Sequence, residues 1–441
     1  MKFTIVTSAL ILTGYALAVP LDRQQQVFGV HDNLAPLYVS GDSIADSYII
    51  MLKNNLSPQD LANHATWIKS TVERTDRPWF LDSRNGIEHV YDTPYIKGYS
   101  GRFDDAIIRL IRSSPDVAYI ERDSMVYANE LQRDAPWGLA RVSQREKLSS
   151  GTYEYEYDKN GGEGVKVYVI DTGINVDHED FEGRAIWGIT VPKNDKNEDG
   201  NGHGSHVAGT VAGKTFGVAK KAQPVAVKVL RSNGSGTMSD VIKGVDWSIE
   251  QHEGDKAAAK QAGKKFKGSV ANMSLGGPNS AALNDVVNRA VEAGIVFAVA
   301  AGNENDDACY YSPSGAERAI TVGATSVIDE RAFFSNYGPC VDVFAPGLNV
   351  LSVWRGSKDA TRTISGTSMA SPHVAGLAAY FLSIEDSETT ADAIKAKILR
   401  LATKDILDKI PEDTPNLLVF NNVSGHTQSK HSPLKAILGD I

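Results

Sequence analysis

Three residues, far apart in the chain, have types and neighbours that could perform nucleophilic catalysis. Asp171 stands where a run of β-branched residues should end as a buried strand, His203 lies among glycines ahead of a small-residue helix, and Ser368 stands where another helix should begin. A neutral serine hydroxyl is a weak nucleophile, so it needs a base within hydrogen-bond reach, and that base needs an acid to fix its tautomer. Together the three residues predict acyl transfer, in which Ser368 attacks, His203 takes the proton and Asp171 orients the imidazole.

Each of these residues taken alone has a plainer structural explanation. An aspartate after a strand often caps a turn, a histidine in a glycine-rich loop is often structural, and a serine at a helix start commonly serves as a cap. The combination, in the order Asp, His, Ser and with these neighbours, favours catalysis. His206, three residues after His203, should point elsewhere on its helix and have a structural role.

The elements that must position these residues alternate between strands and helices from about residue 130 onward. Such alternation predicts an α/β domain with a parallel sheet and helices on both faces, in which the working residues gather at the carboxyl ends of the strands. The segment 253–267 is rich in Lys, Ala and Gly, and we expect an exposed insertion there. The expected strands are 165–170, 225–230, 269–275, 295–300 and 319–324, and the expected helices are 206–212, 239–251 and 281–293.

The N-terminal part of the chain has a different rhythm. Residues 19–45 carry no clear period and are expected to form a loose leader. Ser57 and Pro58 then mark a helix start, and a second helix should include 103–111. With strands expected at 48–52, 87–91, 95–99 and 117–122, the order β-α-β-β-α-β predicts a small ferredoxin-like α+β unit.

Length, charge and the first residues bound what the protein can be. A chain of 441 residues suits two folded units with processed ends. Its 45 basic and 54 acidic residues give a net charge of -9 without a polybasic stripe, which argues against nucleic acid and anionic membranes as partners.

Residues 1–18 have the pattern of a signal peptide, with Lys2, an apolar run over 3–12 and the small residues Ala16 and Ala18. A buried N-terminal helix is the alternative. No later stretch reaches the roughly 18 apolar residues of a membrane helix, so we expect no membrane anchor.

Cys309 and Cys340 are the two cysteines of the chain. In an oxidising compartment two cysteines usually pair, and a bridge closing this loop would contribute about 3 to 4 kcal/mol in the chain-entropy account. Two separate buried thiols are the alternative.

The segments around the three catalytic candidates resemble the signatures of the subtilisin family of serine proteases. The similarity rests on residues 169–173, 201–210 and 365–376. An α/β-hydrolase would run Ser, acid, His with the motif G-x-S-x-G, whereas residue 370 is Ala, and chymotrypsin-like enzymes run His, Asp, Ser. Within the family the chain is most similar to the proteinase K group, and its cysteine pair and lysine-rich insertion resemble cerevisin, of the yeast vacuolar branch. Ser205 replaces the usual threonine but keeps a hydroxyl, and Val207 stands where proteinase K has a cysteine.

The resemblance implies a subtilisin-like three-layer domain with further site residues. Asn303 would donate its amide to the oxyanion together with the backbone N–H of Ser368. Substrate would bind as an extended strand between the segments Ser274-Leu275-Gly276 and Gly234-Ser235-Gly236. Ala300, Ala301 and Gly302 are small and would leave room for an apolar or aromatic side chain before the scissile bond, with broad specificity overall.

The resemblance also implies a precursor. Residues 19–129, folded over about 46–127, resemble an inhibitor-type propeptide, the peptidase domain would cover 130–422, and 423–441 would be an extension open to trimming. We expect cleavage near Asn129–Glu130, protein and peptide substrates, a monomer, and a location in the vacuolar lumen or outside the cell. The alternatives are a permanently attached first domain, a released first domain that acts as a protease inhibitor, and an inactive homologue; retention of His203, Ser368 and Asn303 argues against the last.

The chemistry requires no cofactor, but the resemblance suggests a structural calcium site. Asp342 and the backbone carbonyls of Glu317 and Ala319 would supply the oxygen ligands that calcium prefers, with a surface salt bridge or turn as the alternative. N-glycosylation sequons begin at Asn55, Asn233, Asn272 and Asn422. Asn272 should be buried and proline follows the first sequon, which leaves Asn233 and Asn422 as the candidate glycan sites.

Overall fold

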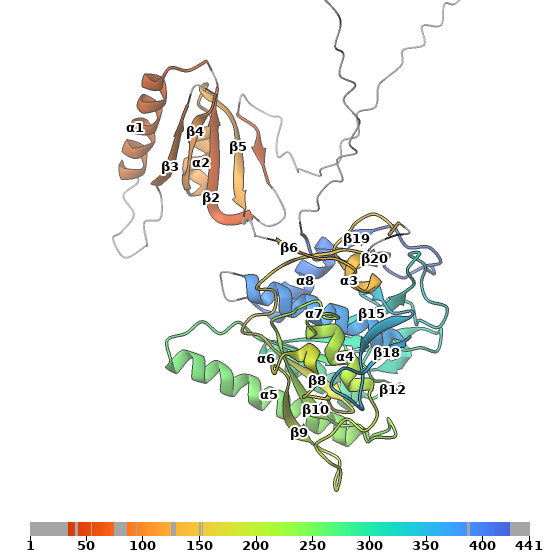
Figure 1. Ribbon diagram of the computed structural model, residues 1–441. Helices are drawn as coiled ribbons and strands as arrows, with labels where there is room; N and C mark the ends of the chain where they lie inside the picture. The colour runs from red at the N-terminus through yellow and green to blue at the C-terminus, as the bar shows by residue number, and fades with distance from the viewer. Residues whose placement is uncertain are drawn as a thin grey trace, which may run out of the picture. The chain divides into compact units, whose positions relative to one another are not determined.

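The computed structural model describes residues 34–39, 43–53, 55–74, 86–93, 95–124, 129–149, 151, 153–385 and 389–423. The chain divides into two compact units, Met1–Val126 and Tyr127–Ile441 (Figure 1). The predicted signal peptide and residues 424–441 of the predicted C-terminal extension lie outside the described residues. Within the described part, no helix is both long and apolar enough to cross a membrane.

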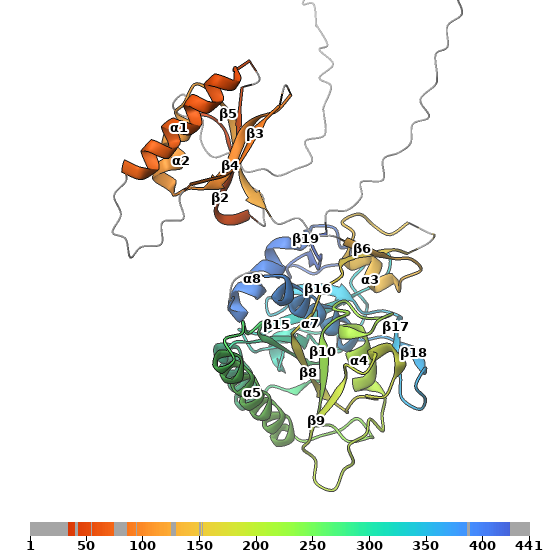
Figure 2. The ribbon, with the colours of Figure 1, turned by 60° about the vertical axis from the view of Figure 1, so that its left-hand side comes forward.

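The first unit is a five-stranded sheet with the strand order β1-β5-β2-β4-β3. The central strand β2 pairs antiparallel with both β4 and β5. Buried residues of α1 and α2, such as Leu61 and Ile107, share one core with Tyr48 and Ile50 of β2, so both helices cover the same face (Figure 2). The bounds are β1 Leu37–Tyr38, β2 Ser43–Leu52, α1 Pro58–Arg74, β3 Gly86–Asp92, β4 Lys97–Arg102, α2 Asp105–Arg112 and β5 Val117–Ser124.

Local sequence explains how α1 begins. Ser57 Oγ accepts a hydrogen bond from the N–H of Asp60, whose carboxylate accepts one from the N–H of Ser57, which is a reciprocal cap. The predicted β-α-β-β-α-β order is confirmed. The prediction of a loose leader up to residue 45 is wrong at β1 and at the start of β2, because the two residues of β1 pair in parallel with β5 and are too few to show a period.

The second unit is built on a nine-stranded sheet with the order β19-β20-β16-β15-β13-β11-β8-β10-β9. Every pair is parallel except β19 with β20. Strand β8 is buried on both faces, as expected for a parallel strand between two helical layers. The strands of this sheet are β8 Lys166–Asp171, β9 Ile186–Thr190, β10 Gln223–Lys228, β11 Ser269–Met273, β13 Ile295–Ala300, β15 Ile320–Thr325, β16 Val343–Pro346, β19 Thr403–Lys404 and β20 Leu417–Leu418.

Helices cover both faces of this sheet. Figure 2 shows α4 on one side of β8 and β10 and the long α5 on the other. Three short antiparallel pairs, β6 with β7, β12 with β14 and β17 with β18, lie outside the main sheet. The remaining elements are β6 Asn129–Gln132, α3 Trp137–Val142, β7 Tyr155–Asp158, η1 Glu179–Phe181, α4 His203–Ala212, α5 Met238–Gln261, β12 Gly277–Pro278, α6 Ala281–Ala293, η2 Ala308–Tyr310, β14 Tyr311–Ser312, β17 Val350–Val353, β18 Thr361–Ile364, α7 Thr367–Ile384 and α8 Ala391–Leu401.

The lysine-rich segment 253–267 differs from the prediction. The sequence predicts a helix over 239–251 followed by an exposed insertion, but α5 continues to Gln261. Ala, Lys and Gln are strong helix formers, so the helix extends until Gly263, which has a positive φ of 62°. Most side chains of this extension are exposed, as expected.

Candidate active site

Asp171 and His203 meet at the carboxyl end of β8. Asp171 is the last residue of β8, and His203 is the first residue of α4. The imidazole Nδ1 lies 2.8 and 2.9 Å from the two carboxylate oxygens of Asp171. A carboxylate can only accept, so Nδ1 donates to Asp171, and in the neutral imidazole Nε2 therefore keeps its lone pair. This is the tautomer that a general base requires.

A second carboxylate holds the two turns that carry this pair. Asp199, which is not among the residues predicted from the sequence, accepts the hydroxyl of Thr172 (2.9 Å) and the backbone N–H of Gly202 (2.8 Å) on one oxygen. Its other oxygen accepts the N–H and the hydroxyl of Ser205 at 2.9 and 2.6 Å. The residue after Asp171 is thereby tied to the residues on both sides of His203, and the hydroxyl at Ser205 has a defined partner. The only sequence signal was an acid four positions before the histidine.

The charges around His203 favour its protonated form. Burial alone would lower the pKa of His203, but attraction to Asp171, the hydrogen bond with Asp171 and the charge of Asp199 outweigh burial. The pKa of His203 therefore lies above its ordinary value. The side chain is 26% exposed, so a proton can exchange with solvent.

Ser368 lies in the first turn of α7, where proline has freed a carbonyl. In a regular helix the carbonyl of Ser368 would accept the N–H of residue 372, but Pro372 has none. The hydroxyl of Ser274 donates to this carbonyl instead, at 2.8 Å. Ser274 is the residue after β11, so one side chain fixes the backbone of Ser368 to the end of this strand.

The side chain of Ser368 has a different partner from the predicted one. Among the described residues, its Oγ donates to the carbonyl of Ser274 (3.2 Å) and makes no hydrogen bond with His203. Hydrogen bonds between catalytic groups are often long or misaligned without substrate. Transfer of the proton to His203 requires the hydroxyl to turn away from Ser274.

Asn303 follows β13 with its amide orientation fixed. Its Oδ1 accepts both the N–H (2.8 Å) and the hydroxyl (3.0 Å) of Thr367, the residue before Ser368. A backbone N–H can only donate, so the oxygen of Asn303 faces Thr367 and Nδ2 is left to donate elsewhere. Gly302 permits this turn, because its φ is 105° and a Cβ there would collide with the amide of Asn336.

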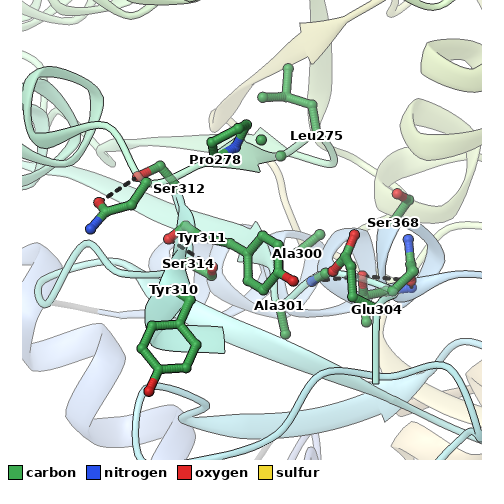
Figure 3. Close-up of a pocket in the computed structure, with 16 residues that line it drawn as sticks. Leu275, Pro278, Ala300, Ala301, Glu304, Tyr310, Tyr311, Ser312, Ser314 and Ser368 are labelled. Carbon is green, nitrogen blue, oxygen red and sulfur yellow. Dashed lines mark hydrogen bonds between the residues drawn. The ribbon is translucent and has the colours of Figure 1, made fainter. Parts of the chain in front are cut away.

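A pocket of about 500 Å³ opens beside Ser368 (Figure 3). Figure 3 shows Ser368 at one end and Pro278 and Ser312 at the other. Buried Asn336 shapes one wall, since its amide donates to the carbonyl of Ala301 and to the carboxylate of Glu304 at 3.0 and 2.8 Å. The lining comprises Leu275, Gly276, Gly277, Pro278, Asn279, Ala300, Ala301, Gly302, Asn303, Glu304, Tyr310, Tyr311, Ser312, Ser314, Thr367 and Ser368.

Two family models match the chain. The one described as the subtilase family matches residues 162–425, and the one described as peptidase inhibitor I9 matches residues 47–129. The chain belongs to the subtilase family.

Individual proteins agree with this assignment. A subtilisin-like protease of Coccidioides posadasii (strain C735) is 54% identical over 89% of this chain and 84% of its own. The subtilisin-like serine protease Pen ch 18 of Penicillium rubens is 53% identical over 90% of this chain and 84% of its own. A crystal structure described as a cold adapted subtilisin-like serine proteinase is 43% identical, with a TM-score of 0.59, and covers 66% of this chain and 99% of that one. The predictions of a subtilisin-like fold, a serine protease and an inhibitor-type propeptide are confirmed.

The second predicted substrate segment of the subtilase lies outside the pocket. Gly234 and Ser235 belong to a tight turn in which the N–H of Gly234 donates to the carbonyl of Arg231 and the N–H of Ser235 donates to Asn233. Asn201, two residues before His203, donates to the carbonyl of Ser232 and so attaches the turn to the histidine loop. The N–H groups of Gly234 and Ser235 are therefore engaged within the protein.

Several other predicted residues of the subtilase have defined places. His206 is fully buried, and its Nε2 lies 3.0 and 3.1 Å from the carbonyls of Val350 and Arg362, so its structural role is confirmed. Cys309 and Cys340 form a disulfide with a Cα–Cα distance of 5.3 Å. Asn272 is fully buried, as expected of a sequon that carries no glycan. Asn233 is exposed, whereas Asn422 is half-buried.

The oxygens predicted as calcium ligands have a protein partner. Lys395 donates from its ammonium to the carbonyls of Glu317 and Ala319 and to the carboxylate of Asp342. No pattern in the sequence points to Lys395, which lies 53 positions after Asp342.

Proposed function

We propose that this subtilase is made as a precursor and, once processed, acts as an endopeptidase of broad specificity. Ser368 is the nucleophile, His203 the general base and Asp171 the acid that orients the base. The observation that carries the proposal is the Asp171–His203 hydrogen bond, because in the neutral imidazole it places the proton on Nδ1 and leaves Nε2 able to accept one. Ser368 in the first turn of α7 supplies the nucleophile, and Asn303, whose Nδ2 is left to donate, supplies the oxyanion donor.

The proposed reaction is a two-stage acyl transfer. The Oγ of Ser368 bonds to the peptide carbonyl carbon while its proton passes to Nε2 of His203, and the carbonyl electron pair moves onto oxygen. Nδ2 of Asn303 and the N–H of Ser368 stabilise that oxyanion. When the carbonyl re-forms, the C–N bond breaks and the leaving amine takes the proton from His203. Water then repeats the sequence on the acyl-enzyme and releases the acid.

The lining of the pocket supports a preference for apolar or aromatic side chains before the scissile bond. Leu275, Pro278 and Ala300 offer apolar contact, and the pocket is large enough for an aromatic ring. The carboxylate of Glu304 also lines the pocket and should disfavour acidic side chains by like-charge repulsion. Binding as an extended strand reads backbone more than side chain, which supports broad specificity.

A series of peptides that differ only in this position tests the preference. We expect Phe, Tyr and Leu to give higher kcat/KM than Asp and Glu, and Glu304→Gln to narrow the difference. A strict requirement for a charged side chain would contradict the proposal.

The precursor proposal extends to processing of the chain. The match to peptidase inhibitor I9 over residues 47–129 and the unit boundary after Val126 support a propeptide removed near Asn129–Glu130. Residues 125–128, just before that bond, lie outside the described residues. Ser368→Ala should accumulate the uncut precursor, whereas the wild type should bind a serine-directed fluorophosphonate and show an N-terminus near Glu130. A mature-sized Ser368→Ala product in a protease-deficient host would exclude autoprocessing.

We further propose that the subtilase enters the secretory pathway by a signal peptide and acts as a monomer in the vacuole or outside the cell, with Asn233 as the preferred glycan site over Asn422. Exposure of Asn233 supports the glycan assignment. Fractionation of cells and medium, sedimentation, and the mass change on glycosidase treatment of Asn233→Gln and Asn422→Gln test these points separately.

A further inference from the structure

The ammonium of Lys395 lies at the meeting point of three oxygen atoms. It is 2.6 Å from the carbonyl oxygen of Ala319, 3.0 Å from that of Glu317 and 3.0 Å from Oδ2 of Asp342. A lysine ammonium has three N–H donors, so these three acceptors satisfy it completely. The side chains of Lys395 and Asp342 are 19% and 21% exposed, so the pair is largely shielded from solvent.

These three oxygens do not fit a calcium ion while the lysine is in place. Calcium takes six to eight oxygen ligands at about 2.3 to 2.6 Å, and here a cation of the protein already lies within hydrogen-bond distance of all three candidates. Two positive charges cannot share one carboxylate at this range without strong repulsion. No group of three or more His, Cys, Asp or Glu side chains suited to a metal occurs among the described residues.

We propose that Lys395 serves as a built-in cation, which fills an oxygen site that would otherwise bind calcium and makes this corner of the subtilase independent of the metal. Lys395 has no role in the proposed chemistry at Ser368. The calcium site is then latent, and shortening Lys395 should open it.

The contacts around the lysine show what the cation holds together. Asp342 also accepts the N–H of Thr321 at 2.9 Å, and its own N–H donates to the carbonyl of Thr321, so it joins the start of β15 to β16. Lys395 lies on α8, and its bonds to Glu317 and Ala319 attach that helix to the segment leading into β15. One cation therefore connects α8, the segment before β15 and the residue before β16, as a bound metal ion could.

The charge of Asp342 depends on this partner. Burial raises the pKa of Asp342, while the ammonium of Lys395 and the hydrogen bond from Thr321 act in the opposite direction. Without the ammonium, the largely buried carboxylate of Asp342 would keep only the N–H of Thr321, and the two carbonyls would lose the donor that they share. Groups of this kind are destabilising when unpaired, and they are the ligands of a hard divalent cation.

Two variants separate a missing charge from an opened site. Lys395→Ala removes both the charge and the side chain, whereas Lys395→Met removes the charge but keeps most of the volume. Both should lower the Tm of the mature, fluorophosphonate-inhibited enzyme in EDTA by about 5 °C. Millimolar calcium should then raise the Tm of Lys395→Ala by about 3 to 8 °C more than it raises that of the wild type, and should not do so for Lys395→Met.

A third variant and a direct binding measurement complete the test. Asp342→Asn added to Lys395→Ala should abolish the additional calcium response, and titration calorimetry should show one more calcium site in Lys395→Ala than in the wild type. Comparison with the wild type removes the effect of any calcium bound elsewhere. The proposal is overturned if Lys395→Ala gains neither calcium binding nor stabilisation by calcium. It is also overturned if calcium raises the Tm of the wild type by as many degrees as it raises the Tm of Lys395→Ala.

Discussion

At the scale of single residues, the site depends on which atom each polar group presents. His203 presents a bare Nε2 because Asp171 occupies Nδ1, and Asn303 presents Nδ2 because Thr367 occupies Oδ1. Within the described part of the chain, Asp199 makes no hydrogen bond with the imidazole, yet its charge raises the pKa of His203 and its bonds to Thr172 and Ser205 hold the neighbouring turns. Electrostatic preorganisation of this kind is usually the largest contribution to acyl-transfer catalysis.

The pH dependence of activity should report the charge of Asp199. Neutral His203 is the active base, so kcat/KM falls as pH drops through the pKa of His203, which lies above its ordinary value. Asp199→Asn removes a negative charge that favours the imidazolium, so the acid limb of the pH–rate profile should move to lower pH. Its kcat should also fall, because an amide has one acceptor oxygen and cannot accept from Ser205 on one side and from Thr172 and Gly202 on the other.

Asp177→Asn is the matched control, since Asp177 is an exposed acid in the loop after β8. It should leave the profile unchanged. An unshifted acid limb in Asp199→Asn would show that Asp199 has only a structural role.

Asn303→Ala should reduce kcat much more than it changes KM. The amide donates to a charge that exists only in the transition state, so its loss leaves ground-state binding nearly intact. The expected loss is about 10² to 10³ in kcat, the size known for the corresponding donor in subtilisin, a member of the same family. Steady-state kinetics on one peptide checks this; a rise in KM with unchanged kcat would assign Asn303 to substrate binding.

At the scale of elements, the start of α7 is joined to the end of β11 by a bond that depends on proline. Pro372 cannot donate to the carbonyl of Ser368, and Ser274 donates in its place. The same serine lies 2.8 Å from the hydroxyl of Ser371, so the first turns of α7 have two polar contacts with β11. The carbonyl of Ser368 therefore lacks its usual helix hydrogen bond and has one from Ser274, at the end of β11, instead. This bond helps to position Ser368.

A double-mutant cycle tests this exchange. Ser274→Ala removes the donor to the half-buried carbonyl of Ser368 and should lower the free energy of unfolding by about 1 to 3 kcal/mol, with a severalfold loss of kcat. Pro372→Ala restores an N–H at the position that can bond to Ser368, so the double variant should be more stable than Ser274→Ala alone. Urea unfolding of the inhibited mature enzyme measures both effects. Strictly additive losses would refute the coupling.

At the scale of the whole molecule, the disulfide connects two loops that shape the pocket. Cys309 precedes Tyr310 and Tyr311, which line the pocket, and Cys340 follows the loop of Asn336, whose side chain holds Ala301 and Glu304. The bond closes a sequence separation of 31 residues. It therefore acts on stability and on the shape of the pocket together.

Replacing both cysteines by serine should cost about 3 to 4 kcal/mol of stability in the chain-entropy account. KM for substrates with a large side chain before the scissile bond should rise more than kcat falls, because the pocket wall loses its tether. Reducing the wild type should approach the same values, while the variant should ignore the reductant. An unchanged KM in both cases would show that the disulfide contributes to stability but not to the shape of the pocket.

Sequence by itself determined the parts of this protein that short segments encode. Motifs around Asp171, His203 and Ser368 involve residues that are neighbours in the chain, and so do the alternation of strands and helices and the helix start at Ser57. Each of these features was predictable from residue types and their spacing. The length of α5 was misjudged only because the boundary of a helix in an Ala- and Lys-rich sequence has no sharp local signal.

Only the tertiary structure decided which distant groups complete these parts. The partners come from other parts of the chain, and Ser274 and Ser368 lie 94 positions apart. The other such partners are Asp199 at Thr172, Asn336 at Glu304 and Lys395 at Asp342. A buried polar atom must find a partner, but many side chains of the right type exist, and the choice is made by which elements pack side by side. That choice turned an expected metal site into a lysine contact.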